Sequence, residues 1–264
     1  MDDPFGRQMR INGFTTPFRK AAGAVLGVLA YNRCPICRRE LSRPKDASGP
    51  VCGDCASKLD ITPSPCPRCA APAGPYSADE QGCRLCAREN YAFSRTVAIG
   101  VHEGLQRTAL LAGQASHGEV ILEWLTDRLW ERRCEQLSAW NCDIVTAVPR
   151  HWTRRITTAN NAAEVIGRRL ARRLDRPFRP NLLSQTRWSK PQASLRPTAR
   201  RKNLGDTFSI TDHRVARDRT VLLCDDVMTT GTTAHRCSRA LLDGGAKSVD
   251  VAVLLRGVGR LEAT

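Results

Sequence analysis

Two adjacent acids and a group of threonines around a glycine stand between an apolar run and a helical pattern, in residues 220–245, TVLLCDDVMTTGTTAHRCSRALLDGG. Backbone N–H groups at a helix N-terminus, together with the helix dipole, hold a phosphate dianion where small residues leave them open. Two carboxylates just upstream accept hydrogen bonds from vicinal sugar hydroxyls and help to retain a magnesium ion. The pattern therefore predicts a site for a phosphorylated sugar, formed by Asp225, Asp226, Thr229, Thr230, Gly231, Thr232 and Thr233.

Each half of this pattern has a commoner explanation when it stands alone. Threonines before a helix are usually N-caps, and an acid pair is usually a solvated turn. Residues 221–224, however, are continuously apolar, as in a strand that is buried on both faces of a parallel sheet. Ligands bind at the carboxyl edge of such sheets, so the combination favours a ligand site over both simpler interpretations.

Four C-x-x-C pairs occupy an N-terminal segment that has few large apolar residues. Such a segment needs metal coordination to fold, and two pairs of thiolates complete a tetrahedral zinc site. Fourteen residues separate the first two pairs and thirteen the last two, so either successive or cross-braced pairing is open. A redox-active dithiol is the alternative, and four motifs without a thioredoxin-like context argue against it. We expect structural zinc on Cys34, Cys37, Cys52, Cys55, Cys66, Cys69, Cys83 and Cys86.

The formal net charge of +15 is concentrated in one region of the chain. Residues 150–202 hold 15 Lys and Arg against only Glu164 and Asp175, a net +13, which predicts one basic surface. The longest apolar stretch, residues 21–30, is about half of the ~20 residues that a membrane span needs. We therefore expect no membrane insertion, and the cysteine pattern indicates a reducing, cytoplasmic compartment.

Periodicity places these features in three regions: an amphipathic helix (17–30) within residues 1–33, a cysteine-rich zinc-binding module in residues 34–90, and an α/β domain in residues 91–264. Helices are expected from Gly104 onward, over 118–137, over 162–174 and after Gly231, and a long polar loop over 184–205. Strands are expected over 94–102, 143–149, 221–224 and 249–255. Alternation of strands and helices predicts a parallel sheet with helices on both faces.

The segment VLLCDDVMTTGTT resembles the phosphoribosyl pyrophosphate (PRPP) signature of the type I phosphoribosyltransferases. With the cysteines, the chain is identified as a member of the ComF family from about Cys34 to Leu255, and AVPRHWTRR resembles the family's V-P-x-H segment. The resemblance implies that Asp225 and Asp226 are the catalytic acids and hold ribose. It implies that PRPP and its phosphates are bound, with magnesium, by Val227, Met228, Thr229, Thr230, Gly231, Thr232, Thr233, Arg150 and Arg154.

Two functions follow from this resemblance and remain open. One is an enzyme that transfers the phosphoribosyl group of PRPP to a nitrogenous acceptor and releases pyrophosphate. The other is a non-catalytic protein of DNA uptake, in which the basic segment with Trp152 and Trp188 follows single-stranded DNA and other DNA-uptake proteins are partners. The chain departs from the family pattern at residues 113–117 and 158–162, where it lacks the usual cations and an aromatic residue.

Overall fold

The computed structural model describes residues 33–41, 49–59, 62, 64–74, 77–79, 82–149, 161–185 and 208–258. The predicted helix over 17–30, most of the long loop, Arg150, Trp152, Arg154 and Trp188 lie outside these residues.

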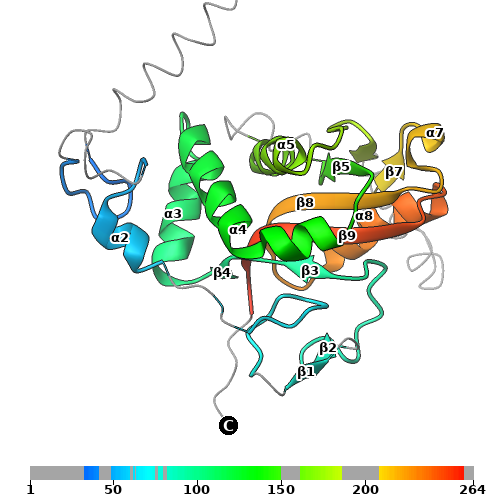
Figure 1. The fold of residues 1–264 in the computed structure, drawn as a ribbon, viewed down its shortest axis with the longest axis horizontal. Coiled ribbons are helices and arrows are strands. Elements are labelled where there is room, and N and C mark those ends of the chain that lie inside the picture. Colours follow the sequence, from blue (N-terminus) through cyan, green and yellow to red (C-terminus); the bar gives the residue numbers. More distant parts are fainter. Residues whose placement is uncertain are drawn as a thin grey trace, which may run out of the picture.

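A five-stranded parallel sheet forms the centre of the molecule (Figure 1). Its strand order runs from β3 (Thr96–Val97) through β9 (Ser248–Arg256) and β8 (Thr220–Met228) to β5 (Ile144–Ala147), and β4 (Gly100–Val101) also pairs with β9. Every pairing in this sheet is parallel. The strand that precedes the candidate site, β8, is therefore an interior strand with partners on both sides.

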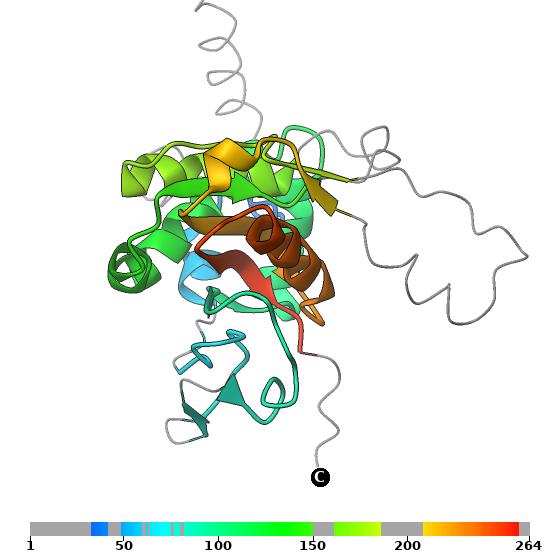
Figure 2. The ribbon, with the colours of Figure 1, turned by 90° about the vertical axis from the view of Figure 1, so that its right-hand side faces the viewer.

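Helices cover both faces of this sheet, as the sequence predicted. On one face lie α3 (Gly104–Gln114), α4 (Glu119–Ala139) and α5 (Ala162–Leu174), and α8 (Thr232–Asp243) covers the other (Figures 1 and 2). Apolar side chains of β8 alternate between two cores. Leu222 and Cys224 pack with α4 and α5, while Val221 and Leu223 pack with α8. Burial on both faces explains why the run has no polar alternation.

Smaller elements extend this framework. The strands β6 (Leu183–Gln185) and β7 (Phe208–Ile210) form an antiparallel pair, and α7 (His213–Ala216) leads from β7 toward β8. In the cysteine-rich segment, α2 (Gly53–Ser57) lies beside α3 in Figure 1, whereas β1 (Ala78–Asp79) and β2 (Gly82–Cys83) pair below the sheet. In the described part of the chain, no helix is long and apolar enough to cross a membrane.

The two halves of the cysteine-rich segment pack on different cores of the α/β domain. Cys34, Val51 and Cys55 join the core formed with α4, and the cysteines from Cys66 to Cys86 join the core formed with α8. This segment has few large apolar residues of its own, and its contacts with the α/β domain therefore contribute to its stability, as do the cysteine clusters.

All four predicted strands differ in their bounds, β5 and β9 by only one or two residues at each end. The strand expected over 221–224 continues to Met228, because Asp225, Val227 and Met228 still pair with β9. The strand expected over 94–102 is divided into β3 and β4, although both pair with β9 in one continuous register. Val97 and Ile99 face one core and Ala98 the other, so successive side chains alternate between the two faces of the sheet.

Candidate functional site

The threonine–glycine loop leaves β8 and enters α8 at the carboxyl edge of the sheet. Gly231 is the N-cap of α8 at φ 77°, in the left-handed region that favours glycine. The first intrahelical bond is donated by the His235 N–H to the Gly231 carbonyl at 2.8 Å, so the preceding N–H groups have no intrahelical acceptor. Thr229, Thr230, Thr232 and Thr233 are exposed, and Gly231 is buried. The loop thus combines open backbone donors with hydroxyl side chains, a combination that suits a phosphate.

The two acids lie near the carboxyl end of β8, just before this loop, and both are partly buried. Asp225 Oδ1 accepts the Asp226 N–H at 2.9 Å, and Asp226 Oδ1 accepts the Val227 N–H at 2.7 Å. Burial and the neighbouring charge of Asp226 raise the pKa of Asp225 well above its usual range. Ionising both acids is therefore unfavourable without a ligand, and a hydroxyl donor or cation that binds here relieves that conflict.

Gln114 is a member of this site that the sequence analysis missed. Its Nε2 donates to Asp226 Oδ2 at 2.5 Å from the C-terminal end of α3. The segment from 113 to 117 stood out in the sequence only as a departure from the family pattern. Gln114 lies in this segment and orients a site carboxylate, and no local pattern links positions 112 residues apart.

Tyr91 and Arg256 support the loop from the side of the cysteine-rich segment. The Tyr91 hydroxyl donates to the Thr230 carbonyl at 2.9 Å, and a Cβ placed on Gly231 would lie 2.9 Å from the Tyr91 ring. Arg256 Nη1 donates to the Met228 carbonyl at 2.8 Å and also to the Thr229 carbonyl. Neither residue belongs to the predicted signature: Tyr91 is 139 residues from its partner in the loop, and Arg256 follows the loop at the end of the next strand.

The structure thus brings Asp225, Asp226 and the loop residues 227–233 together. Arg150 and Arg154, the residues expected to bind pyrophosphate, lie outside the described residues, so their placement stays a prediction.

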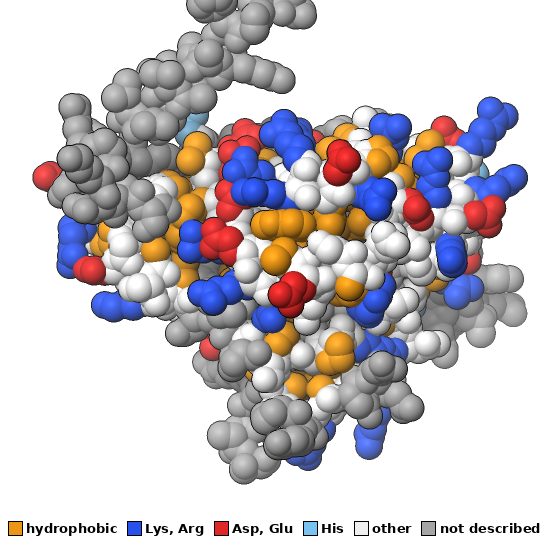
Figure 3. Space-filling model, viewed as in Figure 1, with side chains coloured by type: hydrophobic (Ala, Val, Ile, Leu, Met, Phe, Trp, Pro, Cys, Tyr) orange, Lys and Arg blue, Asp and Glu red, His pale blue; other side chains and the backbone are white. Residues whose placement is uncertain are grey.

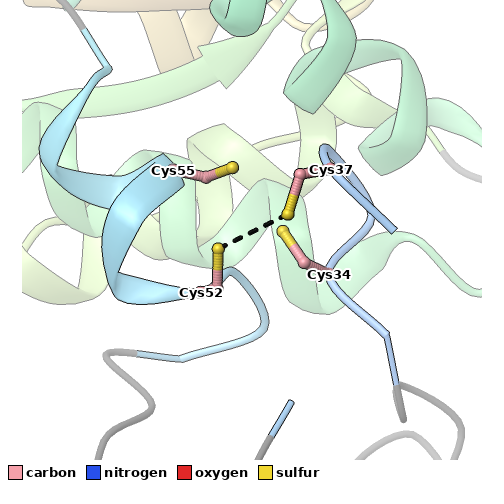
Figure 4. Close-up of side chains that lie close together, drawn as sticks. All are labelled: Cys34, Cys37, Cys52 and Cys55. Carbon is pink, nitrogen blue, oxygen red and sulfur yellow. Dashed lines mark hydrogen bonds between the residues drawn. The ribbon is translucent and has the colours of Figure 1, made fainter. Parts of the chain in front are cut away.

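The eight paired cysteines form two separate groups with successive pairing. In the first, the sulfur atoms of Cys34, Cys37, Cys52 and Cys55 all lie within 4.8 Å of one another and point to a common centre (Figure 4). The Cys37 and Cys52 sulfur atoms are 3.6 Å apart. A tetrahedral zinc ion with Zn–S bonds of about 2.3 Å needs an S–S separation of about 3.8 Å. The four thiols therefore fit a zinc ion.

The second group consists of Cys66, Cys69, Cys83 and Cys86, again within 4.8 Å of one another and all buried. Cys66 lies 3.7 Å from Cys86, and Cys69 lies 3.7 Å from Cys83, measured between sulfur atoms. These separations also match the edge of a zinc tetrahedron. Gly82, at φ 118°, is required beside this group because a Cβ there would lie 2.5 Å from the Cys86 sulfur.

One thiol in each group is poised to ionise first. The hydrogen bond from Cys69 lowers the pKa of Cys66 to about 5 even though burial raises it. In the first group burial raises the pKa of Cys34, but hydrogen bonds from the backbone at Cys37 and Cys52 outweigh it and lower the pKa to about 7. Burial raises the pKa of Cys86 to about 11. Metal ligation requires thiolates, so binding of a cation to either group would release thiol protons.

Three of the four arginines on α5, which the sequence assigned to a basic surface, are engaged with acids on α4. Arg169 forms a bidentate pair with Asp127 at 2.9 and 2.6 Å, and Arg173 donates to the same carboxylate at 3.0 Å. Arg168 lies 3.7 Å from Glu119. Figure 3 accordingly shows acidic and basic side chains interspersed over this face. These pairs reduce the number of α5 cations that are available to a nucleic acid.

Comparison with known proteins agrees with this geometry. Residues 158–263 match the family model of the phosphoribosyl transferase domain. The chain is 26% identical over 234 residues to Competence protein F of Haemophilus influenzae, covering 85% of this chain and 96% of the relative. It is also 26% identical to the DNA utilization protein YhgH of Salmonella typhi, covering 84% and 96%. The chain thus carries a phosphoribosyl transferase domain behind two cysteine clusters. With the two relatives, which are similar over most of the chain, this supports the resemblance to the ComF family.

Similarity to solved structures is weaker. A purine phosphoribosyltransferase from Pyrococcus horikoshii Ot3 is 22% identical, with a TM-score of 0.34 over 50% of this chain and 73% of that chain. Glutamine PRPP amidotransferase from B. subtilis is 18% identical, with a TM-score of 0.35 over 52% of this chain and 27% of that chain. Because these scores are low, the fold class rests on the sheet topology described above.

Proposed function

We propose that the protein binds PRPP with magnesium at the carboxyl end of β8. The observation that carries this proposal is the junction of β8 and α8, where two partly buried acids directly precede an exposed threonine loop at a helix N-terminus. In the bound state the α8 N-terminus and Thr229–Thr233 hold the 5′-phosphate, and Asp225 and Asp226 accept hydrogen bonds from the ribose hydroxyls. Magnesium, carried by the ligand, neutralises charge on the pyrophosphate group.

Phosphoribosyl transfer to a nitrogenous acceptor is the reaction that this arrangement supports. Departure of pyrophosphate leaves an oxocarbenium-like centre at the sugar C1, so the residues act by positioning and by charge rather than as covalent nucleophiles. Asp225 and Asp226 fix the ribose and place negative charge near the electron-poor ring. Arg150 and Arg154 are the proposed contacts of the leaving pyrophosphate, on the basis of the sequence motif alone.

Isothermal titration with PRPP and magnesium tests the binding step. Saturable binding at one site per chain is expected, and it should disappear in the Asp225→Asn, Asp226→Asn double variant, which keeps the side-chain shape but removes two charges. Asp243→Asn, an exposed change at the far end of α8, is the matched control. Equal binding by the double variant and the parent would place the ligand elsewhere. Release of pyrophosphate with candidate acceptors then tests transfer.

Single-stranded DNA handling is a second candidate function. Two observations favour it: the net charge of +13 over residues 150–202, and relatives that are named for competence and DNA utilization. The two functions are compatible on one chain, because PRPP would occupy the β8–α8 junction and DNA the basic segment. In this proposal other DNA-uptake proteins are partners.

A further inference from the structure

The second cysteine group (Cys66, Cys69, Cys83 and Cys86) is connected to the threonine–glycine loop through two side chains. Arg256, at the end of β9, is 4% exposed. Its Nε donates to the Cys69 carbonyl at 2.8 Å, while its Nη1 donates to the carbonyls of Met228 and Thr229. One guanidinium thus connects the turn of residues 66–69, called the knuckle below, directly to the first residues of the loop.

A parallel connection runs through the segment that follows the last cysteine. Arg68, inside the Cys66–Cys69 knuckle, donates to the Cys86 carbonyl at 3.1 Å and to the Glu89 carbonyl at 2.6 Å, and lies 5.7 Å above the Tyr91 ring. The Tyr91 hydroxyl then holds the Thr230 carbonyl. Next to it, the Ala92 N–H donates to Nδ1 of His235 on α8 at 3.0 Å. The knuckle therefore reaches both the loop and the first turn of the helix.

The geometry of the cysteine group gives this connection a dependence on metal. The hydrogen bonds that Arg256 donates within the described residues all go to backbone carbonyl oxygens, and one of these carbonyls is that of Cys69. The four sulfur atoms lie at the separations of a zinc tetrahedron. One ion bound to all four would therefore fix the backbone at Cys69 and, with it, the carbonyl that Arg256 contacts.

We propose that metal in the Cys66–Cys86 group sets the conformation of the threonine–glycine loop, with Arg256 and Tyr91 as the positioning residues that connect them. The binding consequence rests on the proposed PRPP function, but the loop conformation does not. Both residues donate to backbone carbonyl groups of residues 228–230, and these hydrogen bonds fix the backbone that carries the N–H groups of the loop. The first cysteine group packs with α4 instead, so its metal is not expected to act on the loop.

Hydrogen exchange of the full-length, zinc-loaded protein tests the connection without any ligand. Amides of residues 228–236 should exchange about three- to tenfold faster in Tyr91→Phe, since the variant removes only one hydrogen bond. Its zinc content should be unchanged. Arg256→Lys keeps the charge, but a single ammonium group cannot donate to the Cys69 carbonyl and to the loop carbonyls together. The exchange rate of the same amides should increase by a similar or larger factor in this variant. Arg39→Gln, which alters an arginine beside the first cysteine group, should leave these amides unchanged.

Removal of zinc by a chelator is the second test of the connection. Removing zinc from the parent should accelerate exchange of the loop amides, and removing it from Tyr91→Phe should add less, because the connection is already broken. PRPP affinity, measured in parallel, should fall about three- to tenfold in Tyr91→Phe. The proposal would be overturned if the loop amides exchanged at the same rate in both variants and the parent. It would also be overturned if chelation did not change that rate. A parent protein that shows metal-dependent loop exchange but no PRPP binding would instead refute the proposed function alone.

Discussion

The Asp225 carboxyl is held where its charge is unfavourable, since burial and Asp226 both raise its pKa. Replacing Asp225 with Asn removes that conflict while keeping the shape of the side chain. We therefore expect the ligand-free variant to melt higher, by about 2 to 4 °C for each kcal/mol recovered. PRPP with magnesium, which should raise the melting temperature of the parent by mass action, should no longer do so.

Thermal denaturation of parent, Asp225→Asn and Asp243→Asn with and without PRPP measures both effects. The Asp243 variant, which alters an exposed pair on α8, should melt and respond like the parent. A lower melting temperature for ligand-free Asp225→Asn would show that the carboxylate is well stabilised in the empty site, contrary to the pKa argument.

The Gln114 side chain holds the Asp226 carboxylate before any ligand binds. The Gln114→Ala change removes the donor to Asp226, so the carboxylate loses one fixed orientation before the ligand arrives. One such hydrogen bond contributes about 1 kcal/mol, which corresponds to a roughly fivefold weaker PRPP affinity in isothermal titration. Leu111→Ala, an exposed change on the same helix, is the control. An unchanged affinity would mean that Gln114 has no part in the site.

Local sequence could identify some members of this site and not others. The acids and threonines are contiguous, so their spacing alone specifies a strand end, a loop and a helix start. Gln114 and Tyr91 reach the site from 112 and 139 residues away in the sequence, and Arg256 reaches it from 28 residues away. They are brought there by parallel strand pairing, which no local pattern encodes.

Among the secondary-structure elements, α5 agrees with its predicted bounds of 162–174. Its apolar stripe is strong, and Asp175 ends it in the left-handed conformation at φ 53°. What the sequence could not supply was the role of its basic face. Charge counting cannot distinguish arginines that await a phosphate from arginines that pair with a neighbouring helix, and Asp127 on α4 takes two of them.

That α4–α5 contact predicts a pH dependence. Burial alone would raise the pKa of Asp127, but hydrogen bonds from Arg169 and Arg173 outweigh it and hold the pKa below the usual range. A depressed folded-state pKa stabilises the protein above the unfolded pKa of about 3.9, and this contribution is lost as the pH falls through the folded value. Asp127→Asn should therefore lower the free energy of unfolding at pH 7 by about 1 to 2 kcal/mol.

Urea denaturation between pH 3 and pH 7 tests this assignment. The difference between the parent and Asp127→Asn should shrink as the pH falls below about 4. Asp243→Asn, on the exposed Arg239–Asp243 pair, should make little difference at any pH. A constant difference between parent and Asp127→Asn over the whole range would mean that packing, not charge, makes residue 127 important.

At the scale of the whole molecule, the two cysteine groups connect the N-terminal segment to two different cores. Metal analysis of protein purified without added zinc should therefore give about two equivalents per chain. Because metal binding stabilises the folded state, chelation should lower the melting temperature of the full chain, and re-addition of zinc should restore it. Fewer than one equivalent, with the eight thiols present as disulfides, would contradict the assignment.

The basic segment of residues 150–202 is the proposed contact of single-stranded DNA. If this segment follows a DNA backbone, log affinity should fall with log salt concentration with a slope of about −0.7 per phosphate contact. A solvated surface predicts no binding. Since Arg168 and Arg173 already pair with α4 acids, their replacement by Gln should change the slope less than replacement of Arg200 and Arg201. Changing Trp152 or Trp188 to Ala should cost about 1 to 3 kcal/mol if the ring stacks on a base, and should leave the slope nearly unchanged. Fluorescence anisotropy of a labelled oligonucleotide across a salt series separates these cases. A flat titration at low salt would reject DNA binding, and the other arginines of the segment would then be left to pyrophosphate or to solvent.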